Sequence, residues 1–560
     1  MDAKAPTIVR WLVPCLIGAA TATVFLPVLQ NGFVNWDDDG NFLNNPNYRG
    51  LGWQQLAWMF TTFHLGPYQP LSWVTLGLDY LIWGMNPFGY HLTNLLLHAA
   101  NAVVFYFVAA RLLSLAVPSS REEPILLGAA TAALLFALHP LRVESVAWVT
   151  ERRDDLSGLF FLLAIQSYLK AAKAASGPGY KKWLIVTLAL FALSLLSKAA
   201  GITLPAVLLV LDLYPLGRLG RPSSWFGGAS RKVWLEKIPF VLLAAAAGWA
   251  ALLGQYSAAA ARTFEQTGLS ARVAQVFFGL VFYLRKTLVP ISMSPLYEMP
   301  QELNPLDWPY VASAAAVIVI TAALIALRHR WPAGMAAWIC YVALVAPVSG
   351  IVQVGPQLVA ERYSYLSCLA WALVAGGGVA NLWSCSEKYG RKFAVATSTL
   401  VILAAIGLGF LTWRQTEIWH DTETLWRHAV SLDPESSVAR NQLGNALADR
   451  GAFDAAIEQY RDALRVRPTY AGAHYNLALA LADRGDLDGA LRHYEAAVRF
   501  DPENANAHNN LGAILARRGA VDAAIEHYRQ ALQIRPEFPE AHDNLRRALA
   551  LRAQRQQSEH

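Results

Sequence analysis

Charged residues are scarce in this chain of 560 residues. Only 15% are Asp, Glu, Lys or Arg, against 55% apolar residues, and this balance excludes an ordinary soluble domain. The formal net charge of +6 is small for the length, which argues against binding to nucleic acid. The charge is unevenly distributed and is densest in the last part, which is rich in Arg, Glu, Asp and Ala. The sequence therefore predicts a polytopic membrane domain, 1–415, followed by a soluble domain, 416–560.

Cysteine is also scarce, and a cleavable signal is not recognisable. The four cysteines lie in or beside apolar runs with no disulfide or metal-ligand spacing: Cys15, Cys340, Cys368 and Cys385. The first apolar run, 11–29, is long and has no small-x-small exit before Asn31. We therefore expect the cysteines to be packing residues and the first run to remain as a membrane helix.

Long apolar runs, by contrast, are abundant, and we expect about eleven membrane spans. They lie near residues 10–30, 88–110, 124–140, 154–172, 183–198, 200–215, 238–256, 308–327, 332–350, 363–383 and 392–412. Basic residues gather between alternate runs, near 4–10, 111–121, 170–182, 218–237, 328–330 and 388–392. The positive-inside rule makes that side the cytoplasm. An odd number of spans then places the N-terminus in the cytoplasm and the soluble domain on the opposite, extracytoplasmic face.

Two apolar stretches in the outside loops are predicted to lie in the membrane interface rather than to span it. Pro70–Gly84 is too short to cross a bilayer, and Leu269–Leu288 carries Arg272, Arg285 and Lys286. Amphipathic helices of this kind lie flat at the headgroup level, where their basic side chains can point toward lipid. Two interfacial helices on one face favour a membrane-embedded enzyme over a channel.

Three acidic residues stand just beyond the first apolar run. Asp37, Asp38 and Asp39 follow Trp36, and Phe33 precedes them, so aromatic side chains can hold the acids at the membrane surface. Paired carboxylates in that position suit general-base or metal-binding chemistry on a substrate that arrives in the lipid. A solvated acidic turn is the alternative, since Asp-Gly sequences favour turns.

Further ionisable residues fall on the same predicted face, where they are costly near a membrane and so mark function more often than not. The candidates are His139, Glu144, Arg152, Arg153, Lys198, Glu361 and Arg362. Each has a structural alternative: the two arginines can pair with Asp154 and Asp155, and Glu361 with Arg362. Lys198 can extend from a helix end into the headgroups, and His139 can hydrogen-bond locally at a helix end. Asp79 is interpreted as structural.

Several motifs, in this order, resemble the transmembrane and tetratricopeptide-repeat protein O-mannosyltransferases and their bacterial relatives. They are Phe33-Val-Asn-Trp-Asp-Asp38, Tyr68-Gln-Pro-Leu-Ser-Trp73, Pro87-Phe-Gly-Tyr-His-Leu-Thr-Asn-Leu-Leu-Leu-His98, Leu138-His-Pro-Leu-Arg-Val-Glu-Ser-Val-Ala-Trp148 and Ala360-Glu-Arg-Tyr-Ser-Tyr365. The resemblance implies the GT-C glycosyltransferase fold, a polyprenyl-phosphate sugar as donor, with mannose as the expected sugar, and a bacterial inner membrane. It implies that Asp37 and Asp38 are catalytic. Asp39 is an additional acid, and Glu361 stands where many relatives have Asp.

The soluble domain is a repeat array. Pro434, Pro468, Pro502 and Pro536 recur every 34 residues, and small and aromatic residues repeat with them, as in tetratricopeptide repeats. We predict a half repeat at 419–434, repeats at 437–470, 471–504 and 505–538, and a capping helix at 539–554. The first helix of each repeat lines a concave face that can bind extended peptide. Its candidate contacts are Asn441, Asn445, Asn476, Asn509 and Asn510; a scaffold for dimerisation is the alternative.

These observations support one leading hypothesis. It is an all-α integral-membrane glycosyltransferase that moves a sugar to Ser or Thr hydroxyls of a protein, which the repeats bind. Asp37 or Asp38 would accept the proton, and Mg²⁺ or Mn²⁺ could bridge the two acids to phosphate. Arg152, Arg153, Lys198 and Arg362 are the candidates for binding the donor phosphate. The alternative is a non-enzymatic, membrane-anchored repeat scaffold for envelope complexes. A scaffold would not need charged groups at membrane depth on one face, and that feature distinguishes the two hypotheses. A transporter would need charge within the spans.

Overall fold

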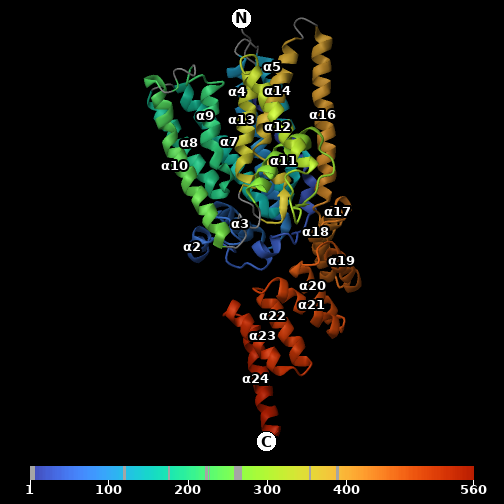
Figure 1. Ribbon diagram of the computed structural model, residues 1–560. Helices are drawn as coiled ribbons and strands as arrows, with labels where there is room; N and C mark the ends of the chain where they lie inside the picture. The colour runs from blue at the N-terminus through green and yellow to red at the C-terminus, as the bar shows by residue number, and fades with distance from the viewer. Residues whose placement is uncertain are drawn as a thin grey trace. The chain divides into compact units, whose positions relative to one another are not determined.

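The computed structural model describes residues 7–117, 122–174, 177–220, 225, 227–257, 268–351, 355–385 and 390–559. Two compact units divide the chain, Met1–Asp421 and Thr422–His560. Both are helical, and the one sheet in the described residues pairs the antiparallel strands β1 (Tyr297–Glu298) and β2 (Gln357–Val359). The predicted all-helical class is therefore confirmed (Figure 1). Four residues of the predicted basic clusters, Lys4, Arg121, Arg221 and Lys388, lie outside the described residues.

The N-terminal unit is a bundle of long helices joined by single helical turns. Its helices are α1 (Thr7–Val24), α2 (Trp53–Thr61), α3 (Pro70–Trp83), α4 (Pro87–Ala116), α5 (Glu122–Ala137), α6 (Val143–Ala147), α7 (Arg152–Ala174), α8 (Pro178–Ser197), α9 (Leu204–Leu213), α10 (Gly228–Ser257), α11 (Leu269–Leu288), α12 (Trp308–Leu327), α13 (Pro332–Val345), α14 (Cys368–Ser384) and α16 (Arg391–Glu417). The short turns are η1 (Leu26–Gln30), η2 (Asp39–Leu43), η3 (Pro140–Arg142), η4 (Val149–Glu151), η5 (Ala199–Thr203), η7 (Ala346–Val348) and η8 (Glu361–Ser364). Several of these helices begin with proline, because the N–H groups of the first turn have no partner within the helix and proline lacks that group.

The chain is an integral membrane protein. By length and apolar composition, five helices of the described chain can cross a bilayer: α4, α8, α10, α12 and α16. The bent pair formed by α5 and the η3–α6 turn makes a sixth. Every predicted span overlaps a helix, but α1, α9, α13 and α14 are apolar and shorter, and α7 opens with four charged residues. Six of the eleven predicted spans therefore meet this criterion, and the total of eleven stays a prediction.

The centre of the bundle is held by close contact between α5 and α14. A Cβ on Gly128 would overlap the carbonyl oxygen of Gly376, and a Cβ on Gly376 would overlap that of Gly128. Ala132 and Ala380 continue the same contact one turn along each helix. Small residues four apart let two membrane helices pack backbone against backbone, which is the main source of helix association where lipid replaces water.

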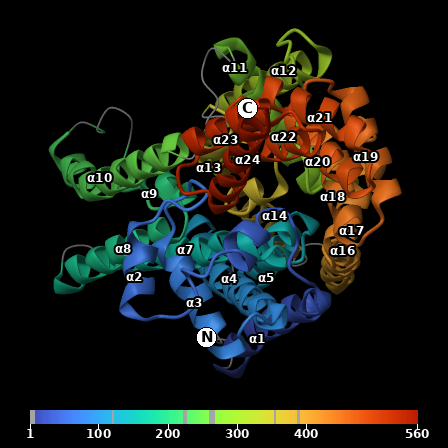
Figure 2. The same ribbon diagram turned by 90° about the horizontal axis from the view of Figure 1, so that it is seen from below.

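Helices α8, α9 and α10 lie together at one side of the N-terminal unit in both views (Figures 1 and 2). Both predicted interfacial stretches are helices, α3 and α11. The predicted lipid contacts on α11 need correction, however. Arg272 donates to the carbonyl of Ile351 at 2.6 Å, and Lys286 donates to the carbonyl of Ile291 at 2.7 Å. Both side chains are buried, and only Arg285 is exposed.

The C-terminal unit consists of α17 (Thr422–Leu432) and three helix pairs, followed by α24 (Pro539–Glu559). The pairs are α18 (Ser437–Asp449) with α19 (Phe453–Val466), α20 (Ala471–Asp483) with α21 (Leu487–Phe500), and α22 (Ala505–Arg517) with α23 (Val521–Ile534). Each pair turns at a glycine with positive φ, at Gly451, Gly485 and Gly519. Tyrosine rings of the second helices lie against small residues of the first, as Tyr460 does against Gly444.

Candidate active site

The acidic turn after the first membrane helix has an unusual backbone. Asp37 has a φ of +99°, a conformation that L-residues with a side chain rarely adopt and that costs on the order of 1–3 kcal/mol. The turn continues directly into η2, a single π-helical turn that begins at Asp39. Strained residues and π-turns both concentrate at functional sites. The result is that neighbouring acids face opposite ways: the side chain of Asp37 is exposed, while that of Asp38 is buried.

Asp38 is fixed inside the protein. Its Oδ2 accepts from the backbone N–H of Val34 at 3.0 Å, and its Oδ1 accepts from the N–H and the hydroxyl of Thr150 at 3.2 and 2.7 Å. Burial nevertheless raises the pKa of Asp38 to about 7. Because both oxygens are used, Asp38 ties the first loop to η4 and positions its neighbour Asp37.

Asp37 is the acid of this turn that faces a charged cluster. Burial among protein atoms on its inner side raises its pKa from 3.8 to about 6, although its side chain retains exposed surface. The nearby cations Arg153 and Arg362 oppose that rise, and the charge of Glu151 adds to it. A carboxylate with a pKa near 6 is largely ionised at neutral pH yet can still hold a proton, which suits a general base.

Glu151 lies at the centre of the cluster and is fully buried. Arg153 donates to it through Nε at 3.1 Å, Lys198 through Nζ at 2.7 Å, and Nε of Arg362 lies 3.3 Å from its Oε1. Burial alone would raise the pKa of Glu151, but these cations outweigh it and hold the pKa well below its ordinary value. Glu151, together with Asp154 and Glu144, thus holds three cations, and two of them, Arg153 and Arg362, act on Asp37.

Three of the four residues predicted to bind donor phosphate meet in this cluster. Lys198 follows α8, and its Nζ also lies 2.8 Å from Asp154, so it points into the protein and not toward the headgroups. Arg153, at the start of α7, and Lys198 keep 16% and 15% of their side chains exposed, which is enough for a ligand to touch them. Arg362 is more enclosed and lies over the ring of Trp148.

The fourth, Arg152, points elsewhere, and its assignment needs correction. It donates to Asn94 through Nε at 2.7 Å and to the carbonyl of Tyr90 through Nη2 at 2.7 Å, and it pairs with Asp79. All of these contacts are buried and the Arg152 side chain is fully enclosed, so Arg152 joins α7 to α3 and α4 and is out of reach of a donor phosphate. The interpretation of Asp79 as structural agrees with this pairing.

The remaining candidates have structural partners. Glu144 pairs with Arg362 and accepts from its backbone N–H at 2.8 Å. Glu361 is turned away from Arg362 and accepts from Ser294 and Tyr297 at 2.9 and 2.8 Å. His139 accepts from the N–H of Leu141 at 3.2 Å and donates to the carbonyl of Thr287 at 3.0 Å, so it caps a helical turn. Glu144 therefore borders the cluster, while Glu361 and His139 stabilise its surroundings.

Asp37 and Asp38 are the residues predicted to bind Mg²⁺ or Mn²⁺. Both oxygens of Asp38 are occupied by protein donors. Within the described ranges, no three His, Cys, Asp or Glu side chains converge in a way that could hold an ion. The side chain of Asp37 is exposed, and Mg²⁺ or Mn²⁺ bound between the two acids and the donor phosphate stays a prediction.

The asparagines of the C-terminal unit largely bond to one another. Asn476 donates to Asn441 at 3.0 Å, and Asn544 donates in the same way to Asn509. Asn441 and Asn509 are buried, so these bonds link successive repeats and leave little for a peptide. Three of the five predicted contacts are half-buried and reach the surface: Asn445, Asn476 and Asn510.

Comparison with protein families decides the nature of the C-terminal unit. The model described as TPR repeat matches residues 444–483 and 478–519, and the tetratricopeptide repeat model matches residues 505–538. The C-terminal unit is a tetratricopeptide-repeat domain. Among solved structures, the domain-sized matches include the first TPR of Spaghetti (RPAP3) bound to an HSP90 peptide, 22% identical, covering 22% of this chain and 96% of that one, with a TM-score of 0.21. MamA is 24% identical, with 24% and 74% covered and a TM-score of 0.23.

The similarity to curated relatives covers the N-terminal unit as well as the repeats. Human protein O-mannosyl-transferase TMTC1 is 26% identical, and the match covers 80% of this chain and 54% of the relative. Human TMTC4 is 27% identical, with 80% and 65% covered, and Drosophila melanogaster Tmtc3 is 24% identical, with 71% and 48% covered. The resemblance predicted from the motifs is confirmed by this similarity. The chain spans between 48% and 65% of the length of these relatives.

Two residues of the site had no individual role predicted for them. Glu151 and Thr150 organise the cations and Asp38, respectively. Both belong to the short segment between two membrane helices that also carries Arg153. Their position in the chain, between an apolar run and the charged start of the next helix, is the sequence feature that could have indicated their role.

Proposed function

We propose that the N-terminal unit is a glycosyltransferase of the GT-C type. It moves a sugar, with mannose expected from the names of its relatives, from a polyprenyl-phosphate donor to a Ser or Thr hydroxyl of a protein. The observation that carries the proposal is the strained, outward-facing Asp37 close to Arg153 and Arg362, two of the cations that contact Glu151. The reaction takes place on the extracytoplasmic face, where the basic-residue pattern puts the acidic turn.

Asp37 acts as the general base. In its ionised form it accepts the proton of the acceptor hydroxyl while the hydroxyl oxygen bonds to the anomeric carbon of the sugar. The bond between that carbon and the phosphate oxygen breaks, and polyprenyl phosphate leaves with one more negative charge than it had in the donor. Because the pKa of Asp37 is near 6, the proton is accepted without a large penalty at neutral pH.

The cations stabilise the charge that develops on the leaving phosphate. Arg153 and Lys198 expose part of their side chains, and Glu151 holds both in place before the donor arrives. Preorganised cations of this kind stabilise the transition state more than the bound donor, because the phosphate gains negative charge only as the bond to the sugar breaks. Arg362 is held by Glu144 and Glu151 and supports the cluster from within.

The repeat domain binds the acceptor protein. Its Asn445, Asn476 and Asn510 are half-buried and reach the surface, and each would exchange a hydrogen bond within the domain for one to the backbone of an extended peptide. Contacts with a peptide backbone do not demand a particular sequence. A scaffold without enzymatic activity would need none of the strain at Asp37.

The test uses the purified full chain in detergent with polyprenyl-phosphate mannose and an acceptor protein, and measures sugar transferred to Ser or Thr by mass spectrometry. Asp37→Asn should lower the rate by roughly two to four decades, the usual contribution of a general base. Asp39→Asn removes an acid from the same turn and is the matched control, which should retain activity. Equal rates for wild type and Asp37→Asn would refute the assignment of the base, and an inactive wild type with bound acceptor would favour the scaffold.

A further inference from the structure

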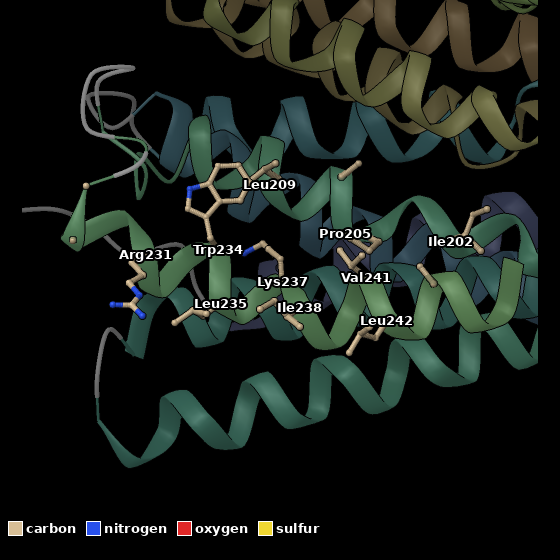
Figure 3. Close-up of a pocket in the computed structure, with 14 residues that line it drawn as sticks. Ile202, Pro205, Leu209, Arg231, Trp234, Leu235, Lys237, Ile238, Val241 and Leu242 are labelled. Carbon is tan, nitrogen blue, oxygen red and sulfur yellow. The ribbon is translucent and has the colours of Figure 1, made fainter. Parts of the chain in front are cut away.

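Two apolar grooves run along α10, one on each side of it. The first, of about 870 Å³, lies between α10 and the η5–α9 segment and is lined by Ile202, Pro205, Ala206 and Leu209 on that wall (Figure 3). The second, of about 700 Å³, lies between α10 and α8 and is lined there by Leu184, Ile185 and Leu188. Both volumes fall in the roughly 300–1,000 Å³ range of sites for small organic ligands.

The two grooves meet at the start of α10. Gly228, Arg231 and Leu235 line both of them. Figure 3 shows Arg231 at one end of the row of labelled side chains and Ile202 at the other. A ligand with one polar end and two apolar chains could therefore place its polar end at Arg231 and one chain on each side of the helix.

The charge at this end of α10 is positive. Beneath the grooves, Arg218 pairs with Asp212 at 2.9 Å and with Glu236 at 2.8 Å, and Lys237 pairs with Asp212 at 2.5 Å. In this buried group two cations face two carboxylates, so it contributes no net charge.

Arg231 and Lys232 lie outside that balance. Both are exposed, and neither is ion-paired with a carboxylate of the described residues. The ammonium of Lys232 lies 4.1 Å from the centroid of the Tyr180 ring. Two uncompensated positive charges therefore stand where the grooves join.

We infer that α10 carries a binding site for an anionic diacyl phospholipid, whose phosphate contacts Arg231 and Lys232 and whose two chains occupy the two grooves. The site is separate from the Asp37 cluster and does not depend on the proposed reaction. Basic residues near a membrane surface each contribute about 1 kcal/mol to binding of anionic lipid, so charge selects the headgroup and the grooves select two chains.

The experiment is native mass spectrometry of the full chain in neutral detergent, titrated with dioleoylphosphatidylglycerol or dioleoylphosphatidylcholine. The wild type should retain the anionic lipid at lower concentration than the neutral one. Arg231→Ala combined with Lys232→Ala should weaken phosphatidylglycerol binding roughly thirtyfold. Arg328→Ala combined with Arg330→Ala removes two exposed charges at the end of α12 and is the matched control, which should bind as the wild type does.

A second variant tests the chains. Ala206→Trp places a large ring in the first groove at an exposed position, so it should weaken binding of the diacyl lipid but leave that of lysophosphatidylglycerol, which needs one groove, unchanged. If this variant fails to fold, Ile185→Trp applies the same test to the second groove. The inference is overturned if the charge variant binds phosphatidylglycerol like the wild type, if the two headgroups bind equally, or if the groove variant binds both lipids normally.

Discussion

The pKa of Asp37 gives the proposed reaction a specific dependence on pH. A carboxylate with a pKa of about 6 is ionised to about nine tenths at pH 7 and to about one tenth at pH 5. If the ionised form is the base, kcat/KM should therefore be about tenfold lower at pH 5 than at pH 7. A carboxylate with the ordinary pKa of 3.8 would lose almost nothing over the same interval.

Two substitutions should shift the acid limb of the pH profile of kcat/KM, the part that falls toward low pH, in opposite directions. The charge of Glu151 raises the pKa of Asp37, so Glu151→Gln should shift the limb to lower pH. The charge of Arg153 lowers that pKa, so Arg153→Gln should shift the limb to higher pH. The position of the limb, and not the absolute rate, is the readout, because both variants also disturb the phosphate site.

The assay is initial-rate transfer from polyprenyl-phosphate mannose at subsaturating donor between pH 4.5 and 8, with a check that each variant is intact after incubation. A flat profile down to pH 5, or shifts of the same sign in both variants, would refute Asp37 as the base.

Three other predictions concern Arg152, Lys198 and the orientation of the chain in the membrane. Arg152→Gln should cost about 3–5 kcal/mol of stability, since it leaves Asp79 buried and unpaired, and a thermal-denaturation series should show partial recovery in the double variant with Asp79→Asn; an unchanged melting temperature would contradict the pairing. Lys198→Ala should weaken both donor binding and turnover, and Lys198→Arg should keep part of each, whereas donor titration curves equal to that of the wild type would exclude Lys198 from the phosphate site. A reporter that is active only outside the cytoplasm, fused after His560, should be active, and a stable but inactive fusion would reverse the predicted orientation.

The helices and repeats were predictable because their signals are local. Apolar runs indicate helices wherever they occur, and the recurrence every 34 residues indicates a solenoid without knowledge of any contact. The stretches Pro70–Gly84 and Leu269–Leu288 became α3 and α11 for the same reason.

The direction of individual charged side chains was not predictable in this way. Arg152 and Arg153 are neighbours, but successive residues on a helix point about 100° apart, so one faces the site and the other faces Asp79. Which arginine does which depends on Asp79 and Glu151, and no pattern near the arginines reveals those contacts. Asn441 and Asn509 were likewise assigned to an open groove, although their partners lie one repeat away.

The glycine contact between α5 and α14 limits how far the segments that carry Glu144 and Arg362 can move apart. The α5 chain continues through η3 to Glu144, and α14 is preceded by the turn that carries Arg362. Because the two backbones touch at Gly128 and Gly376, the spacing of Glu144 and Arg362 is fixed by atoms that no rotamer change can move. A single methyl group added at either glycine would force the two helices apart, although every charged residue of the site would still be present.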